Sequence, residues 1–138
     1  MQKKMSTSIV TYLGALRTKC VHIKSSDSFI TDAPVDNNGK GEAFSPTDTV
    51  ATALASCMMT IMGIKANDLN VDLTDTTATV TKVMDANPRR ISEIKVIFDF
   101  PSVAEEKHRK ILENAALTCP VNHSLHPDIK RDIQFNWR

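Results

Sequence analysis

The segment from Glu42 to Ala66 constrains the fold more than any other part of this 138-residue chain. The Ser45 hydroxyl can cap a first helical turn, and Pro46 suits the first helical position, where its missing N–H is not needed. Asp48 can reach back to Ser45 as in a capping box. From Val50 to Ile64 no residue is charged, and apolar residues occupy more than one face. The pattern therefore predicts a long helix buried inside the protein.

One face of this expected helix carries only small residues. They recur at three- and four-residue spacing, which places them on one side of a helix. Small side chains allow another backbone to come close, so a second copy of the same helix could pack there. The residues are Thr49, Thr52, Ser56, Thr60 and Gly63.

Cys57 lies in the middle of the expected helix, among apolar neighbours. From the helix alone, the simplest interpretation is a small core residue, the usual place of a free cysteine. Burial disfavours the thiolate, and the helix dipole acts only within the terminal turns. A reactive Cys57 would therefore need a nearby cation.

The rest of the chain alternates strand and helix patterns, which predicts an α+β fold in a single domain, residues 1–138. Asn87-Pro88 is typical of a turn, and Pro120 should end a helix before Cys119, which gives that cysteine some mobility. Ser102 and Glu105 form a second candidate capping box. The predicted elements, in order, are a hairpin of Thr7 to Leu13 and Leu16 to Lys24, a short strand near Phe29, the central helix, strands at 71–84 and 91–100, a helix to about Leu117, a short helix from Pro120, and a closing strand at 129–137.

Composition excludes several classes of function. The chain has 17 basic and 16 acidic residues, so its net charge of +1 predicts neither nucleic-acid nor membrane binding. The longest apolar region, Ala53 to Ile64, is shorter than the ~20 residues of a membrane span, and the N-terminal region lacks the apolar core of a secretory signal. The odd number of cysteines argues against a structural disulfide framework and predicts a reducing, cytoplasmic location.

Two motifs carry a family resemblance. SPTDTVATALASCMMTIMGI, from Ser45, and CPVNHSL, from Cys119, resemble the OsmC/Ohr family of thiol-dependent peroxidases, and YLGALRT and TDAP precede them in the family's order. The match is to the broad OsmC-like branch. It implies antiparallel sheets wrapped around a buried central helix, in an intertwined homodimer.

The resemblance also implies a reaction without metal or cofactor. The Cys57 thiolate would attack a hydroperoxide and become a sulfenic acid, and Cys119 would condense with it to a disulfide. Dithiols such as dihydrolipoyl groups are candidate reductants, and the Met-rich surroundings favour organic hydroperoxides. Arg17 would lie beside Cys57 as its cation. From the sequence alone, Arg17 is a surface residue whose stem crosses the sheet.

One position departs from the best-studied branch, which carries a glutamate ten residues before the reactive cysteine to hold the arginine. Thr47 occupies that position here. Asp48 points about 180° away from Cys57 around a regular helix, so capping is its simplest role. We therefore expect Arg17 to lack the carboxylate that would fix it, and peroxide turnover to be slow.

Two alternatives remain open at this stage. One is a metal-binding module of Cys119, His123 and His126, with Cys20 and His22 as further candidate ligands, although Cys-x3-His-x2-His is not a strong zinc pattern. The other is a catalytically silent relative with an inert, buried Cys57. The four glycines form no Walker or Rossmann pattern, so nucleotide chemistry is not expected.

Overall fold

The computed structural model describes residues 5–138. It contains two compact units, one ending at Thr49 and the other running from Val50 to Arg138, and each is described by itself. Helix α1 (Pro46–Asp68) begins near the end of the first unit and continues into the second.

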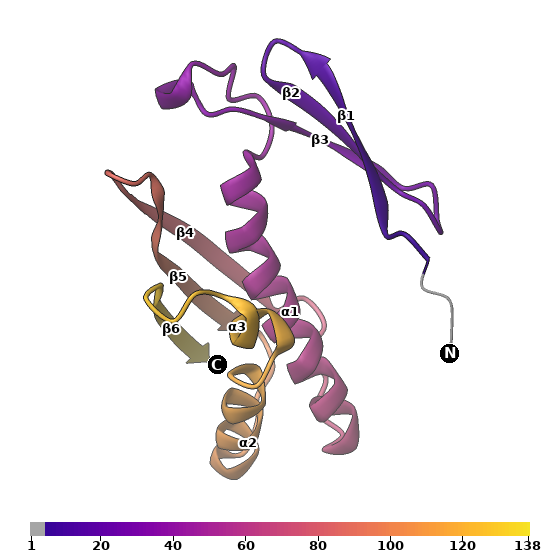
Figure 1. The fold of residues 1–138 in the computed structure, drawn as a ribbon. Helices are drawn as coiled ribbons and strands as arrows, with labels where there is room; N and C mark the ends of the chain where they lie inside the picture. Colours follow the sequence, from indigo (N-terminus) through magenta and orange to yellow (C-terminus); the bar gives the residue numbers. More distant parts are fainter. Residues whose placement is uncertain (1–4) are drawn as a thin grey trace. The chain divides into compact units, whose positions relative to one another are not determined.

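The first unit holds an antiparallel sheet in the order β1-β2-β3 (Figure 1). Its strands are β1 (Ser8–Gly14), β2 (Arg17–His22) and β3 (Ser28–Asp32), and the 3-10 helix η1 (Val35–Asn37) follows. Ala15 and Leu16 form the turn with φ of 52° and 62°, so β2 begins one residue later than predicted. The predicted hairpin and the short third strand are both confirmed.

This sheet has no apolar core of its own. Among residues 5–49 the buried side chains are Thr31, Asp32 and Ser45, all of them polar. Large apolar side chains of the strands are exposed: Ile9, Val10, Tyr12, Leu13 and Phe29. The first unit therefore depends on a cover that its own residues do not supply.

The start of α1 is the predicted capping box. The Ser45 N–H donates to Asp48 Oδ2 at 2.9 Å, and the Asp48 N–H donates to Ser45 Oγ at 3.1 Å. The helix is 23 residues long, so the expectation that this region is too short to cross a membrane does not hold for the helix as formed. Within residues 5–138, α1 is the one helix whose length and hydropathy would suffice, a test that a core helix also passes.

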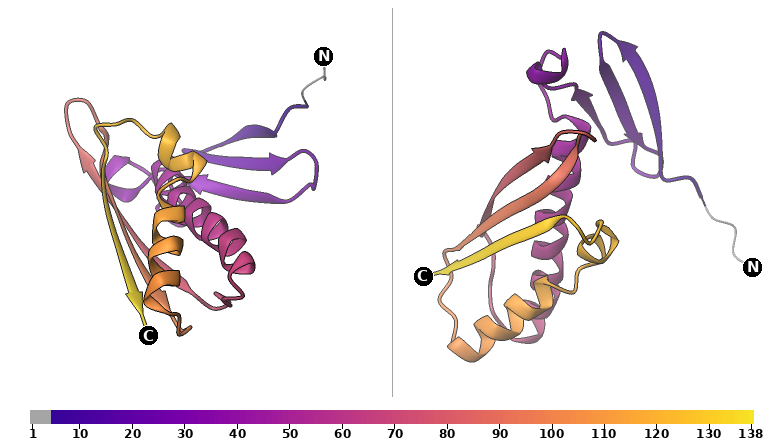
Figure 2. Two further views of the ribbon diagram at one scale, coloured as in Figure 1. Left: turned by 90° about the horizontal axis from the view of Figure 1, so that it is seen from below. Right: turned by 60° about the vertical axis from the view of Figure 1, so that its left-hand side comes forward.

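The second unit holds a mixed sheet in the order β4-β5-β6, with α1 across one face (Figure 2). β4 (Thr77–Asp85) is antiparallel to β5 (Arg90–Phe100), whereas β6 (Lys130–Trp137) is parallel to β5. The prediction of antiparallel sheets is therefore wrong here, because the two helices between β5 and β6 return the chain in the same direction. The predicted strand at 71–84 is also too long, since residues 71–76 form turns around Asp75, whose φ is 70°.

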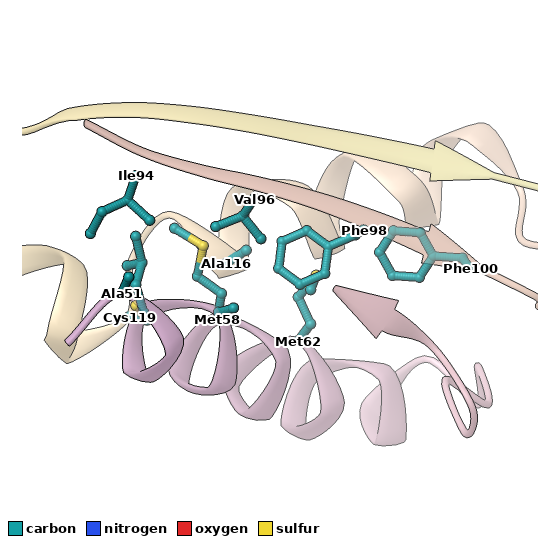
Figure 3. Close-up of a cluster of buried hydrophobic side chains, with 11 residues drawn as sticks. Ala51, Met58, Met62, Ile94, Val96, Phe98, Phe100, Ala116 and Cys119 are labelled. Atoms are coloured by element: carbon teal, nitrogen blue, oxygen red, sulfur yellow. The ribbon is translucent and has the colours of Figure 1, made fainter. Parts of the chain in front are cut away.

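The core lies between α1 and the sheet. Side chains of Ile94, Val96, Phe98 and Phe100 alternate along β5 and point toward α1 (Figure 3), as the pattern predicts. The helix residues buried on this side are Ala51, Leu54, Ala55, Met58, Met62 and Ala66. Thr52, Ser56 and Thr60 are exposed, and so is Ile64, so α1 is covered on one side only within the described chain.

Two helices connect β5 to β6. α2 (Glu106–Ala116) begins after Glu105, which makes no side-chain cap, so the capping box predicted for Ser102 and Glu105 is wrong. The Ser102 hydroxyl donates instead to the Asp72 carbonyl. α3 (Pro120–Ser124) begins at Pro120 as predicted, which places Cys119 at the break between the two helices.

Candidate functional site

The structure brings Cys57 and Cys119 together in the second unit. Cys119 is completely buried in the core, and the half-buried Cys57 of α1 packs against the same cluster. The Cys57 side chain lies close enough to the Cys119 thiol to raise its pKa. Both residues are free cysteines. Two thiols from distant segments of the chain therefore lie close together without a disulfide bond between them.

Burial raises the pKa of the Cys119 thiol above its ordinary value, and the neighbouring Cys57 side chain raises it further. The backbone N–H groups of Asn122 and Val121 act in the opposite direction, by donating to the sulfur. Since an ordinary thiol already has a pKa of about 8.5, Cys119 is protonated at neutral pH.

Local hydrogen bonds shape the turn that carries Cys119. Its sulfur caps α3 by accepting the Asn122 N–H at 3.3 Å, and its carbonyl accepts the His123 N–H at 3.2 Å. The Asn122 side chain donates from Nδ2 to the Leu117 carbonyl at 2.9 Å. Asn122 therefore contacts the chain on both sides of Cys119.

Arg17 forms a second, separate cluster in the first unit. Its Nε lies 2.7 Å from Asp32 Oδ1 and its Nη2 lies 2.8 Å from Asp32 Oδ2, a two-point ion pair. Asp32 is 1% exposed, and its Oδ2 also accepts the Glu42 N–H at 3.2 Å. The expectation that Arg17 lacks a carboxylate is therefore wrong: Asp32 holds it, through geometry that matches the planar guanidinium.

This ion pair is charged over the whole ordinary pH range. Hydrogen bonds from Arg17 lower the pKa of Asp32, with burial acting against them, and the same bonds raise the pKa of Arg17. The sequence held a signal for the pair, because Arg17 and Asp32 are directly opposite in the β2–β3 register. Arg17 and Cys57 belong to different units, so a role of Arg17 beside Cys57 stays a prediction.

The residues proposed for a metal module are not grouped. Within residues 5–138 no three His, Cys, Asp or Glu side chains lie close enough to hold a metal ion. His126 Nδ1 accepts the Asp128 N–H at 3.0 Å, and His22 Nδ1 lies 2.7 Å from Ser25 Oγ. The Cys119 sulfur already accepts a backbone N–H. The geometry contradicts the metal-binding alternative.

Comparison with known proteins extends these observations. The family model described as OsmC-like protein matches residues 39–134. A crystal structure from Psychrobacter arcticus 273-4, named for osmotic stress induction and a detoxification response, is 56% identical with a TM-score of 0.94, and the match covers 98% of both chains. None of the curated proteins compared with the chain matches it.

More distant structures share the fold. An organic hydroperoxide resistance protein OsmC from Legionella pneumophila is 16% identical, with a TM-score of 0.74 over 97% of this chain and 99% of that one. An OsmC-like protein from Mycoplasma pneumoniae is also 16% identical, with a TM-score of 0.80 over 99% of both chains. At this identity the likeness concerns the fold alone.

Proposed function

Since the chain belongs to the OsmC-like family, we propose that it is a thiol-dependent peroxidase in which Cys57 reduces a hydroperoxide and Cys119 resolves the oxidised cysteine. The observation that carries this proposal is the contact between the two free thiols. The name of the hydroperoxide resistance protein from Legionella supports the same reaction class.

The first step oxidises Cys57. Its thiolate attacks the terminal oxygen of the hydroperoxide, the O–O bond breaks, and the leaving alkoxide takes up a proton to become an alcohol. Cys57 becomes a sulfenic acid, which is the reversible rung of cysteine oxidation. Cys57 suits this step better than Cys119 because it is partly exposed, whereas Cys119 is completely buried and held as a thiol.

The second step consumes Cys119. The Cys119 sulfur loses its proton and attacks the Cys57 sulfur, the S–O bond breaks, and the hydroxide leaves as water with one proton. A disulfide joins the two residues. A dithiol reductant, with dihydrolipoyl groups as the proposed class, then returns both cysteines to thiols by exchange and is itself oxidised to a disulfide.

Arg17 is the proposed cation for the Cys57 thiolate, as the family resemblance implies. Its guanidinium is permanently charged, and the buried Asp32 carboxylate fixes its plane and position. Because Asp32 neutralises part of this charge, we propose that its contribution is to hold Arg17 in one orientation. Glu42 lies farther from Arg17, with Oε1 3.8 Å from Nη2, and is mostly exposed.

We also propose that the protein works as a cytoplasmic homodimer. A second copy could cover the exposed small-residue face of α1 and the exposed apolar strands of the first unit. A hollow of about 700 Å³ lies beside that face and is lined partly by Thr60, Gly63 and Ile64. Organic hydroperoxides are the proposed substrates, because Met58, Met59 and Met62 follow Cys57 closely in α1 and are buried or half-buried.

Stopped-flow oxidation of the reduced protein tests the reaction. Cumene hydroperoxide should oxidise Cys57 faster than hydrogen peroxide does, and mass spectrometry should find one disulfide between Cys57 and Cys119. A protein that leaves both peroxides intact would be a catalytically silent relative, which contradicts the proposal. Cys20→Ser is the matched control, because Cys20 lies beside Thr18 on the face of β2 opposite to Arg17 and should leave the rates unchanged.

A further inference from the structure

We infer that Arg131 is a positioning residue for disulfide formation: through Asn122 it holds the turn that places Cys119 against Cys57. The inference rests on the proposed function, since it concerns the second step of that reaction. It comes from a cluster of hydrogen bonds around a side chain that the family motifs do not include.

The Arg131 side chain extends from β6 and is enclosed by acceptors. Its Nε donates to Asn122 Oδ1 at 3.0 Å, and its Nη2 donates to the Asn122 carbonyl at 2.9 Å and the Leu125 carbonyl at 3.3 Å. Nη1 donates to the carbonyls of His126 and Ile129. A guanidinium has five N–H groups, and these five contacts use all of them.

All of these acceptors belong to one short stretch of chain, 122–129, which follows Cys119. α3 has only five residues, and so short a helix is not stable by its own hydrogen bonds. Arg131 supplies partners for the carbonyls at its end, which the helix itself leaves unpaired. The geometry of the turn therefore depends on a residue in the sheet.

Asn122 transmits this restraint to the cysteine. The same residue that Arg131 binds twice donates its backbone N–H to the Cys119 sulfur and its Nδ2 to the Leu117 carbonyl. Arg131 thus holds Asn122 in place, and Asn122 in turn holds the Cys119 sulfur and the Leu117 carbonyl that precedes it. No bond runs from Arg131 to the thiol itself among those that the described residues make, so its action is through position.

Position matters because a disulfide has narrow geometric limits. The two sulfurs must come within about 2.05 Å with a defined torsion angle, and a misplacement of about 1 Å can slow an oriented reaction by ~100-fold. If the turn is loosened, the disulfide should form more slowly and the Cys57 sulfenic acid should persist for longer. A second hydroperoxide molecule can then convert it to a sulfinic acid, which is not reduced by thiols.

The test separates the two steps in Arg131→Lys, which keeps the charge but loses the planar fork. Stopped-flow and quenched samples analysed by mass spectrometry follow sulfenic acid and disulfide with cumene hydroperoxide. We expect sulfenic acid formation to change less than about twofold while disulfide formation slows about 10- to 100-fold. With excess hydroperoxide, Cys57 sulfinic acid should accumulate in the variant and not in the wild-type protein.

Arg109→Lys is the matched control. Arg109 also binds backbone carbonyls, those of Ala104 and Arg138, and lies over the Trp137 ring, and none of these contacts is with the turn around Cys119. The Arg109→Lys variant should lose about as much stability as Arg131→Lys does, but it should form the Cys57–Cys119 disulfide at the wild-type rate. Asn122→Ala removes only the side-chain part of the link, keeps the N–H that Cys119 accepts, and covers the case in which Arg131→Lys does not fold.

Two outcomes overturn the inference. One is disulfide formation at the wild-type rate in Arg131→Lys or Asn122→Ala; the other is equal slowing in Arg109→Lys, which would indicate a general loss of stability. If the wild-type protein forms no sulfenic acid, the proposed function fails separately. Oxidation by diamide then tests the role of Arg131 and Asn122 alone. Diamide first reacts with one thiol, and the disulfide then forms by attack of the second thiol, as in the proposed reaction. Disulfide formation with diamide should therefore be slower in both Arg131→Lys and Asn122→Ala.

Discussion

Cys57 and Cys119 lie in the same core cluster, but one belongs to a long helix and the other to a short turn between helices. Cys57 lies in the middle of α1, a helix of 23 residues with a capping box at its start. Cys119 lies at the break between α2 and α3, the latter only five residues long. The backbone of a long packed helix fixes the first thiol, whereas side-chain hydrogen bonds fix the second.

The difference assigns different sensitivities to the two steps of the proposed reaction. Attack on a hydroperoxide needs a steady, partly exposed sulfur, which a helix interior provides. Disulfide formation needs the second sulfur within narrow limits of distance and torsion angle, which the hydrogen-bonded turn around Cys119 sets. Changes near Cys57 should therefore alter oxidation, and changes near Cys119 should alter resolution.

The largest expected effect comes from removing either sulfur. Cys57→Ser should abolish hydroperoxide consumption, because the attacking thiolate is gone. Cys119→Ser should still consume one equivalent and stop as a Cys57 sulfenic acid, which dimedone labelling detects by mass spectrometry. Hydroperoxide loss at the wild-type rate in Cys57→Ser would reverse the assignment of the two cysteines.

Asp32→Asn should affect oxidation and leave resolution unchanged. The substitution keeps the shape of the side chain but removes the charge that binds Arg17 at two points. If Arg17 has the proposed role, we expect Cys57 oxidation to slow by roughly 10- to 100-fold, because the guanidinium is then no longer held in one orientation. Thr47→Glu is the comparison, and it should change the rate little since Arg17 already has a carboxylate. Equal oxidation rates in Asp32→Asn and wild type would remove Arg17 from the mechanism.

The same pair predicts a pH dependence of stability. The pKa of Asp32 is lowered in the folded protein, so its contribution is present above the ordinary aspartate pKa of about 3.9 and is lost as the pH falls below it. Urea unfolding at a series of acidic pH values should show a smaller decline in Asp32→Asn than in wild type. A parallel decline in both proteins would contradict this.

The raised pKa of Cys119 predicts the pH dependence of resolution. Only the thiolate attacks, so disulfide formation should rise about tenfold for each pH unit and continue to rise above the ordinary thiol pKa of about 8.5. The raised pKa of Cys119 also contributes to the free energy of unfolding. This contribution is present below the ordinary thiol pKa and is lost as the pH rises through the raised pKa of the folded protein. Quenched-flow measurements of the rate of disulfide formation between about pH 6 and pH 10 test whether that rate keeps rising. A rate that levels off below pH 8 or so would contradict the raised value.

Gly63→Leu tests the far side of α1. Among residues 5–138, a Cβ at Gly63 would meet no atom within 4 Å beyond its chain neighbours and its own helix backbone, and leucine favours a helix more than glycine does. The fold of one chain should therefore be unharmed, while a dimer packed on this face should be weakened by about 1–3 kcal/mol through overpacking. Light scattering at micromolar concentration measures the effect. An unchanged dimer would place the interface elsewhere.

The smallest effect is expected at the start of α1. Asp48→Ala removes one half of the capping box and should lower the free energy of unfolding by about 0.5–2 kcal/mol. Oxidation and resolution should both keep their rates, because the middle of the helix stays packed in the core. A loss of oxidation at unchanged melting temperature would show that Asp48 acts on the site directly.

The sequence predicted most elements because their signals are local. The capping box of α1, the hairpin of β1 and β2, the alternation along β5 and the helix break before Pro120 all depend on neighbouring residues. The direction of β6 was missed because it depends on how far α2 and α3 carry the chain. The start of α2 was misplaced because Ser102 bonds to the distant Asp72 carbonyl instead of to its own helix.

The candidate site was predicted in the same uneven way. Cys57 and Cys119 came from motifs, and the structure brings them together in one core cluster, while their catalytic roles stay predictions. Asp32 was not predicted because it is far from Cys57 in sequence, although it lies directly opposite Arg17 in the β2–β3 register. Arg131 carried a signal that was not used, since it occupies an apolar-face position between Ile129 and Ile133 in the alternating closing strand.

The parallel pairing of β6 with β5 also sets an order of assembly. During synthesis α1 and the β4–β5 hairpin can associate early, because their contacts are close in sequence, whereas β6 must wait for the whole crossover. Arg131 arrives with β6, so the turn around Cys119 closes last. A nascent chain therefore holds Cys57 in its helix before its resolving partner is in place. Under the proposed reaction, a Cys57 oxidised in that interval would be reduced by thiols outside the chain, until β6 docks and completes the turn around Cys119.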